Sequence, residues 1–301
     1  MDVPVGKIVY TQMLNSTGGI EADITVTRLS ETAYVMVTPA ATRRADQEWL
    51  LRHLGDANVV ITDVTAGEGV LAVMGPNVRD LLAKVSPNDF SNDAFPFGTA
   101  QEIEIGMGLA RAHRVSYVGE LGWEIYVSAD MAGHVFETLA PALEEMNGAY
   151  CGMHMMDSCR IEKGFRHFGH DITCEDHVLE AGLGFAVDRK KDDFMGRDAV
   201  LAKREAGLDR RMVQFLLNDA EPLLYHNEPI IRDGAFVSHL TSGNYGHSLG
   251  AAVGMGYVPC TGQSVEEVLA SRYEIEVAGV RVAATPSLKP LYDPTSQKVR
   301  S

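Results

Sequence analysis

The pattern of hydrophobic residues changes near residue 195, and this change constrains the fold more than any other feature of the chain. Before it, strand-like runs alternate with longer amphipathic stretches such as MAGHVFETLAPALEEM (131–146), which is typical of an α/β unit. After it, apolar runs are short and are separated by Gly, Pro and Asn turns. Such spacing favours an all-β barrel or sandwich. The sequence therefore predicts an α+β chain, with an α/β region over residues 1–190 and a β-barrel domain over 191–301.

A strong turn signal at residues 16–19, Ser-Thr-Gly-Gly, separates two predicted strands near the N-terminus. The second strand, IEADITVTRL (20–29), alternates apolar and polar residues, so one of its faces is expected to be buried. Asp23 then lies on the polar face. The predicted buried positions are Ile20, Ala22, Ile24 and Val26.

Several helices can be placed from their capping signals. TRRADQEWLLRHLG (42–55) predicts a helix with Thr42 as its N-cap and Gly55 past its end, and residues 149–163 predict another that ends at Gly164. The segment 165–187, between that helix and the change of pattern, is expected to be rich in loops.

The stretch VSYVGELGWEIYV (115–127) predicts a hairpin that bends at Gly119-Glu120-Leu121-Gly122. In that register Tyr117 lies opposite Glu124, and both side chains share one face of the sheet. A phenol beside a carboxylate is consistent with a structural hydrogen bond. It is also consistent with one wall of a pocket for a flat polar ligand, and the pattern alone leaves both readings open.

The composition excludes some classes of function. A net charge of −15 argues against a nucleic-acid partner, because binding to phosphates depends on clustered Lys and Arg. No apolar run approaches the roughly 20 residues of a membrane span, so a membrane partner is not expected. The first residues lack the features of a signal peptide, which makes a cytoplasmic location, or the mitochondrial matrix in a eukaryote, the default expectation.

Common catalytic and metal-binding signatures are also missing. The motif GMGLAR (106–111) only half matches a dinucleotide-binding loop, and the chain contains no P-loop, GxSxG or HExxH motif. His167, His170 and His177 lie near Cys174, but their spacing matches no zinc-ligand pattern, so no metal site is predicted. The four cysteines show no disulfide-like spacing and are expected to be reduced.

Four segments taken together carry a family resemblance: YTQMLNSTGGIEADITVTRL (10–29), SYVGELGWEIYV (116–127), MDSCRIEKGFRHFGHDI (156–172) and HLTSGNYGHSLGAAVGMGYV (239–258). They resemble the glycine-cleavage T-protein family, the tetrahydrofolate-dependent aminomethyltransferases, and look closest to the folate-binding C-terminal half of the dimethylglycine and sarcosine dehydrogenases and oxidases. The resemblance implies a three-domain cloverleaf around a tetrahydrofolate channel, with two interleaved α/β subdomains in 1–190 followed by a C-terminal β-barrel.

The resemblance also implies roles for five residues. Asp23 is the catalytic candidate, because it matches the family aspartate that assists proton transfer as the one-carbon unit is captured. Glu124 matches the residue that reads the pterin ring, with Tyr117 beside it; a carboxylate suits the adjacent N–H donors of a pterin. Arg160 matches an arginine near the glutamate tail or the pterin edge, and Tyr10 matches a position that lines the channel. Structural alternatives stay open, such as a solvated Asp23 or an Arg160 that pairs with a surface acid.

The implied activity is capture of an iminium, formaldehyde or aminomethyl unit on tetrahydrofolate to give 5,10-methylenetetrahydrofolate. The one-carbon donor is expected to come from a flavoprotein dehydrogenase domain or a lipoyl carrier protein, so FAD would belong to a missing or partner domain. Only nine residues precede Tyr10, so the N-terminus is expected to be truncated and the first subdomain incomplete. The alternatives are a non-catalytic folate-binding or assembly module and a folate-dependent demethylase of the same family.

Overall fold

The computed structural model describes residues 2–188 and 190–301. The chain forms two compact units, and each is assembled from separate stretches of sequence. The chain passes from one unit to the other inside β1 (Ile8–Leu14) and returns inside β2 (Ile20–Arg28), which form a three-stranded sheet with β3 (Tyr34–Val37) in the order β1-β2-β3. The first unit comprises Met1–Tyr10, Thr25–Gly152 and Thr295–Ser301; the second comprises Thr11–Ile24 and Met153–Pro294.

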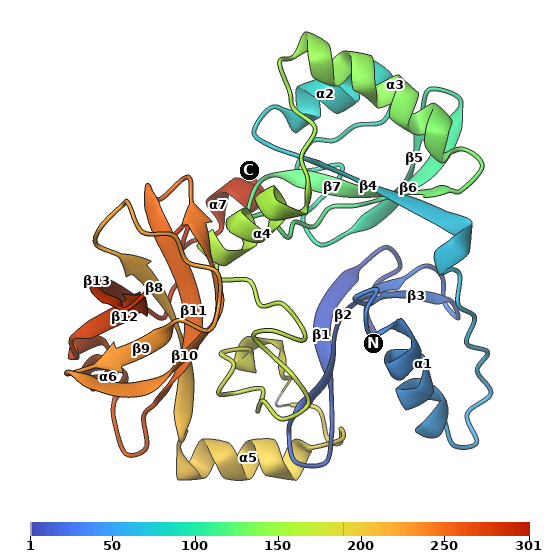
Figure 1. Cartoon of the computed structure of the whole chain (residues 1–301). Coiled ribbons are helices and arrows are strands. Elements are labelled where there is room, and N and C mark those ends of the chain that lie inside the picture. Colours follow the sequence, from blue (N-terminus) through green and yellow to red (C-terminus); the bar gives the residue numbers. More distant parts are fainter. Residues whose placement is uncertain (1, 189) are drawn as a thin grey trace. The chain divides into compact units, whose positions relative to one another are not determined.

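The first unit is built on a four-stranded antiparallel sheet in the order β4-β7-β6-β5. Helices α2 and α3 cover one face of this sheet (Figure 1). The bounds of the sheet and its helices are β4 (Glu68–Met74), α2 (Val78–Val85), β5 (Ala100–Ile105), β6 (Gly108–His113), β7 (Gly122–Ser128) and α3 (Ala132–Glu145). The remaining helices of the unit are α1 (Arg43–Arg52), the 3-10 turn η1 (Thr65–Gly67) and α7 (Gln297–Arg300).

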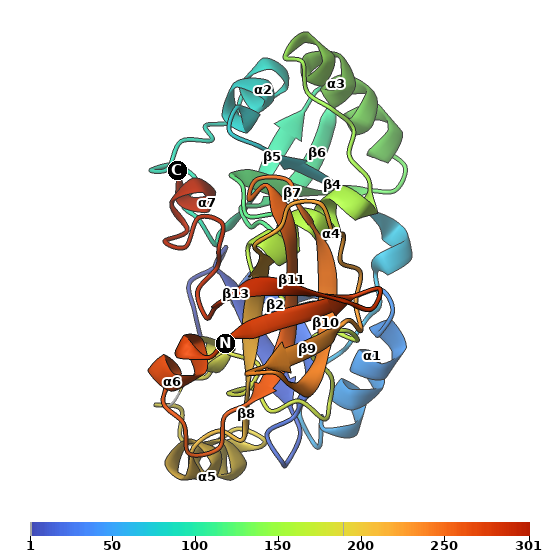
Figure 2. The ribbon, with the colours of Figure 1, turned by 60° about the vertical axis from the view of Figure 1, so that its left-hand side comes forward.

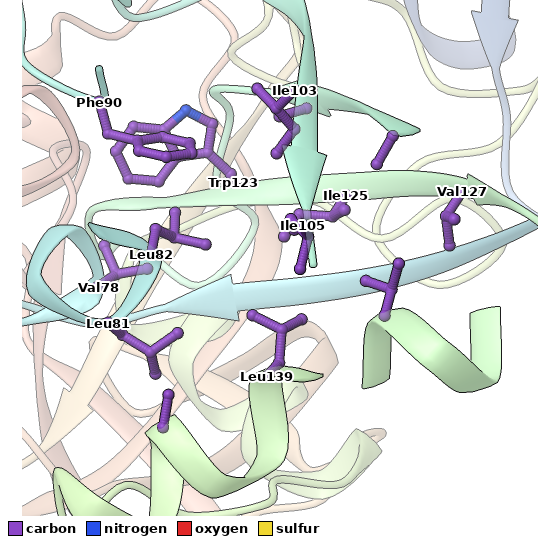
Figure 3. Packing of buried hydrophobic residues seen from close by; sticks show 14 of the residues in the cluster. Val78, Leu81, Leu82, Phe90, Ile103, Ile105, Trp123, Ile125, Val127 and Leu139 are labelled. Atoms are coloured by element: carbon purple, nitrogen blue, oxygen red, sulfur yellow. The ribbon is translucent and has the colours of Figure 1, made fainter. Parts of the chain in front are cut away.

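The core of the first unit lies between the sheet and its two helices. Trp123, Ile125 and Val127 alternate along β7 and point to the helix side, where Figure 3 shows them among side chains of α2 and α3. Phe90 meets the Trp123 ring edge-on, with the ring centroids 5.2 Å apart. Because successive side chains of a strand point to opposite faces, the residues between them, including Glu124, lie on the other face of the sheet.

The second unit contains a closed six-stranded barrel in the order β10-β11-β8-β13-β12-β9 (Figure 2). Inward-facing side chains, among them Val213, Phe215 and Leu217 of β8, fill its interior. The bounds in this unit are α4 (Met153–Glu162), the 3-10 turn η2 (Gly184–Ala186), α5 (Arg197–Ala206), β8 (Arg210–Leu217), β9 (Pro229–Arg232), β10 (Ala235–Gly246), β11 (Ala251–Pro259), α6 (Val265–Ala270), β12 (Tyr273–Val277) and β13 (Val280–Ser287).

The structure confirms the predicted α+β class and the C-terminal barrel. The predicted loop-rich segment 165–187 contains η2 as its one helical turn, and its buried residues form a small core with Leu14, Ile20 and Val200. The domain division at residue 190 stays a prediction. No helix in residues 2–188 or 190–301 combines the length and apolarity needed to cross a membrane.

The predicted alternation along residues 20–29 needs one correction. Ile20, Ala22 and Ile24 are buried as expected, but the alternation then slips, so that Thr27 is buried and Val26 is only partly covered. The N-cap of α1 is Thr42 as predicted. Its hydroxyl donates to the carboxylate of Asp46 instead of accepting from the helix backbone, because Asp46 is buried and requires donors.

Candidate functional site

The turn between β1 and β2 fixes the strand that carries Asp23. The side-chain oxygen of Asn15 accepts hydrogen bonds from the backbone N–H groups of Thr17 (3.1 Å) and Gly19 (2.9 Å), and Gly18 adopts a left-handed conformation with φ of +81°. A Cβ atom on Gly19 would lie 2.1 Å from the carbonyl oxygen of Cys174. The Gly-Gly pair therefore lets this turn pack directly against the loop segment of the second unit.

Asp23 is half-buried on β2, and its orientation is set by the neighbouring strand. The side-chain amide of Gln12 on β1 donates a 2.8 Å hydrogen bond to Oδ1 of Asp23. Asp23 is thus a partly covered carboxylate held by a neutral donor.

The predicted register of the Glu124 hairpin is wrong. β6 ends at His113 and β7 begins at Gly122, so the connection is longer than a four-residue bend and Tyr117 lies within it. The residue opposite Glu124 is His113. The phenol beside Glu124 belongs instead to Tyr126, two residues along the same strand, whose hydroxyl donates a 2.7 Å hydrogen bond to Oε2 of Glu124.

A polar cluster surrounds Glu124 on the face of the sheet opposite the helices. The rings of His113 and Tyr126 lie 4.4 Å apart, and the Arg111 guanidinium donates to Nε2 of His113 (3.1 Å) and to Glu68 (2.9 Å). His113 accepts through Nε2, and its buried Nδ1 has no hydrogen-bond partner among the described residues. The cluster therefore contains one orphaned polar atom beside a carboxylate.

Burial sets the protonation of this cluster. It raises the pKa of the Glu124 carboxyl, although the hydrogen bond from Tyr126 opposes the effect. It lowers the pKa of His113 to about 4, and the nearby Arg111 charge acts in the same direction. His113 is therefore neutral near pH 7.

Arg160 is buried at the C-terminal end of α4 and held by several acceptors. Its guanidinium donates to Asp157 (2.8 Å), Asp171 (2.6 Å), the hydroxyl of Ser242 (2.8 Å) and the carbonyl of Phe165 (3.2 Å). Only 3% of its side chain is exposed. This geometry favours a role in positioning the surrounding loops over direct contact with a ligand.

Asp171 is a structural anchor that the sequence did not single out. It is fully buried, and besides Arg160 it accepts hydrogen bonds from the backbone N–H of His167 (2.9 Å) and the hydroxyl of Thr241 (2.5 Å). Its own carbonyl accepts from the Tyr257 hydroxyl (3.0 Å). Asp171 thus ties α4 and the loop segment to β10 and β11, and the Gly-His-Asp-Ile turn around it was the available signal.

The five predicted site residues are divided between the two units. Tyr10, Tyr117 and Glu124 belong to the first, with Tyr10 partly exposed on β1, and Asp23 and Arg160 belong to the second. His167 and His170 stack with centroids 4.7 Å apart and His226 lies edge-on to His170. Nowhere in the described ranges do three or more His, Cys, Asp or Glu residues form a group able to hold a metal ion.

The chain matches the models of two known protein domains, one after the other along the sequence. The model of the GCVT N-terminal domain matches residues 1–191, and that of the glycine cleavage T-protein C-terminal barrel domain matches residues 210–293. The chain belongs to the glycine cleavage T-protein family. The family resemblance expected from the four sequence segments is therefore confirmed, as is the barrel at the C-terminal end.

Two relatives that align with nearly the whole chain are an oxidase and a dehydrogenase. The chain is 38% identical to 4-methylaminobutanoate oxidase (formaldehyde-forming) of Paenarthrobacter nicotinovorans, over 100% of this chain and 36% of that protein. It is 33% identical to mitochondrial sarcosine dehydrogenase of Homo sapiens, over 99% of this chain and 34% of that protein. The chain thus spans about a third of the length of these relatives.

A solved T-protein structure has the same fold. Aminomethyltransferase T of the glycine cleavage system from Bartonella henselae superposes with a TM-score of 0.83 at 25% identity, covering 97% of this chain and 78% of that one. This agreement confirms the T-protein fold over nearly the whole chain.

Proposed function

We propose that this chain performs tetrahydrofolate-dependent one-carbon transfer, in which an iminium or formaldehyde unit is captured to give 5,10-methylenetetrahydrofolate. The observation that carries the proposal is the match of both T-protein domains, which together cover most of the chain. The chain also keeps a carboxylate at each of the two positions, Asp23 and Glu124, where the family resemblance places its functional acids.

The residues around Glu124 suit a pterin chemically. Oε2 of Glu124 is taken by Tyr126, whereas Oε1 accepts no hydrogen bond from the described residues. A pterin presents adjacent N–H and amino donors, which a carboxylate can accept. The orphaned Nδ1 of buried His113 adds a second polar atom that a ligand can satisfy. We therefore assign Glu124 to recognition of the pterin and Tyr126 to holding it in place.

We assign to Asp23 the proton transfer that accompanies one-carbon capture. When bound, tetrahydrofolate supplies the nucleophilic nitrogens that accept the one-carbon unit. Asp23, oriented by Gln12, takes or returns the proton at the reacting nitrogen as the new bond forms. Tyr10 and Tyr117 are proposed to contribute to folate binding, and Arg160 to act through the loops that it holds with Asp171.

A formaldehyde or iminium donor is favoured over an aminomethyl group on a lipoyl carrier. One relative that aligns with the whole chain is named as a formaldehyde-forming oxidase, and another as a sarcosine dehydrogenase. Both relatives are about three times as long as this chain. The flavin chemistry that generates the donor is therefore assigned to a further domain or to a partner protein.

Anaerobic calorimetric titration with tetrahydrofolate tests the binding part of this proposal. We expect one-to-one binding to the wild type and at least about tenfold weaker binding to Glu124→Gln, since the loss of a charge-assisted hydrogen bond costs about 1.5–3 kcal/mol. Glu102→Gln removes an exposed carboxylate from β5, which is two strands away from β7 in the same sheet, and should bind like the wild type. Absence of binding in a folded sample, or equal affinity of the Glu124 and Glu102 variants, would contradict the assignment.

A further inference from the structure

A cavity lies at one mouth of the C-terminal barrel. It has a volume of about 630 Å³ and lies where β8 begins, at the end of the barrel near α5 (Figure 2). Barrel mouths are frequent ligand sites because the ends of the strands leave the interior open there. The cavity lies wholly within the second unit and contains none of the five residues assigned to folate. Its main lining residues are Leu179, Phe185, Arg204, Leu208, Arg211 and Cys260.

Arg211 occupies an inward-facing position of the barrel. Side chains alternate along a strand, so Arg211 points to the same side of β8 as Val213, Phe215 and Leu217, which fill the barrel interior. Its Nε atom is buried without a hydrogen-bond partner, and no carboxylate pairs with it in the part of the chain that the structure describes. Buried polar atoms normally have a hydrogen-bond partner, so the unpartnered Nε of this partly buried arginine is an exception.

Two carboxylates that adjoin lining residues in the sequence are already paired with other cations. Glu180 accepts from Lys203 (2.9 Å) and Arg210 (3.0 Å), and Asp209 accepts from Lys203 (2.6 Å). The residue that follows Lys203 is Arg204, and the residue that follows Arg210 is Arg211; both of these arginines line the cavity. Neither arginine has an acidic partner among residues 2–188 and 190–301. Two positive charges therefore face one cavity in a chain whose net charge is −15.

The other walls of the cavity are apolar or neutral. Leu179, Leu208 and the exposed ring of Phe185 provide apolar contact area. Burial raises the pKa of the Cys260 thiol, although the neighbouring Arg211 opposes this effect, so the thiol is uncharged near neutral pH and leaves the charge of Arg211 unneutralised. Gln263 uses its amide oxygen to accept from Arg232, which leaves its NH₂ group as a further donor.

We propose that this barrel-mouth cavity binds a small organic anion, whose carboxylate or phosphate group pairs with Arg204 and Arg211 while its apolar body lies against Phe185, Leu179 and Leu208. An arginine offers paired N–H donors in a plane that matches either oxyanion. The site stands independently of the folate proposal, because no residue is shared between the two.

Calorimetric titration with benzoate, phenyl phosphate and benzamide tests the proposal. Benzoate and phenyl phosphate present the two candidate anions on the same apolar ring, and benzamide is a neutral analogue of benzoate. The full chain is compared with Arg211→Gln, Arg204→Gln and the control Arg44→Gln. Arg204 and Arg44 are both exposed helical arginines, so neither substitution is expected to disturb the fold.

We expect at least one of the two anions to bind, and benzamide to bind at least about tenfold more weakly. Both cavity substitutions should weaken the anion by about tenfold or more, whereas Arg44→Gln should leave its affinity unchanged. The anion that binds with the higher affinity shows whether the arginines prefer a carboxylate or a phosphate group. Failure of both to bind, equal binding of benzamide, or unchanged affinity in a folded Arg204→Gln variant would overturn the proposal.

Discussion

Tyr126 and Glu124 lie two residues apart on β7, and the Tyr126 hydroxyl donates a 2.7 Å hydrogen bond to Oε2 of Glu124. Both side chains lie on the face of the sheet that the helices leave uncovered, where His113 and Arg111 also lie. Burial raises the pKa of the Glu124 carboxyl above its usual 4.5. This carboxyl is thus harder to ionise in the folded protein than in the unfolded chain, so the stability of the fold depends on pH.

The Glu124→Gln substitution should remove a pH dependence of folding. Because the pKa of Glu124 is higher in the folded state, the folded state holds this proton more tightly, and ionisation favours unfolding. The wild type should therefore lose stability relative to Glu124→Gln as the pH rises above 4.5, until Glu124 is ionised in the folded state. Urea unfolding across this range measures the difference. Glu102→Gln, on exposed sheet surface, should show no such trend, and a pH-independent difference for Glu124→Gln would refute the prediction.

His113 should produce the opposite dependence. Its pKa is lowered from 6.5 to about 4, so the unfolded chain takes up a proton before the folded state does. Stability should fall by about 3 kcal/mol as the pH drops from 6.5 to about 4. The His113→Gln variant should lack this component, whereas His53→Gln, an exposed histidine, should retain it. Proton NMR titration of the His113 ring provides a direct check, and a midpoint near 6.5 would show the account to be wrong.

Asp171 and Asp157 both pair with Arg160 and form a matched test of burial. The Asp171 side chain is 0% exposed and that of Asp157 is 38% exposed. We expect Asp171→Asn to cost about 3 kcal/mol or more of unfolding free energy, because Arg160 keeps a buried charge without its main partner. Asp157→Asn should cost about 1 kcal/mol or less. Equal losses in urea unfolding would mean that Asp171 is not the anchor of this loop segment.

Gly19 and Gly133 provide a second matched pair. A Cβ at position 19 would lie 2.1 Å from a backbone oxygen, which cannot move without shifting the chain, whereas nothing lies within 4 Å of a Cβ at position 133 in α3. Gly19→Ala should destabilise the protein by at least about 2 kcal/mol. Gly133→Ala should stabilise it by about 0.5–1 kcal/mol through helix propensity. Thermal unfolding of the two variants measures both effects, and a neutral Gly19→Ala would contradict the close packing of the turn.

The sequence predicted those features that depend on local periodicity. The alternation after Gly19 placed Ile20 and Ala22 in the core, and the turn-rich pattern beyond residue 195 predicted the barrel. These signals succeed because each depends on a repeat of two or on a turn residue that is visible within a few positions.

Features that depend on pairing between distant residues were not predicted. The hairpin register placed Tyr117 opposite Glu124, whereas His113 occupies that position, because a two-glycine turn signal does not reveal how far the strands extend. The role of Asp171 could not be predicted from the sequence, because its partners Arg160 and Thr241 are separated from it by 11 and 70 residues. The family resemblance identified Arg160 as a site residue. Only the structure shows that Asp157, Asp171 and Ser242 all accept hydrogen bonds from its guanidinium.

The central claim is that Asp23 moves a proton during one-carbon capture on tetrahydrofolate. The most direct measurement is the rate of 5,10-methylenetetrahydrofolate formation from formaldehyde and tetrahydrofolate, corrected for the rate without protein, with folate affinity determined on the same samples. The account predicts that Asp23→Asn keeps its affinity but loses about 100-fold in protein-dependent rate, whereas Glu21→Gln on the same strand stays active. A wild type with no rate above background, or an Asp23→Asn variant as fast as the wild type, would contradict it.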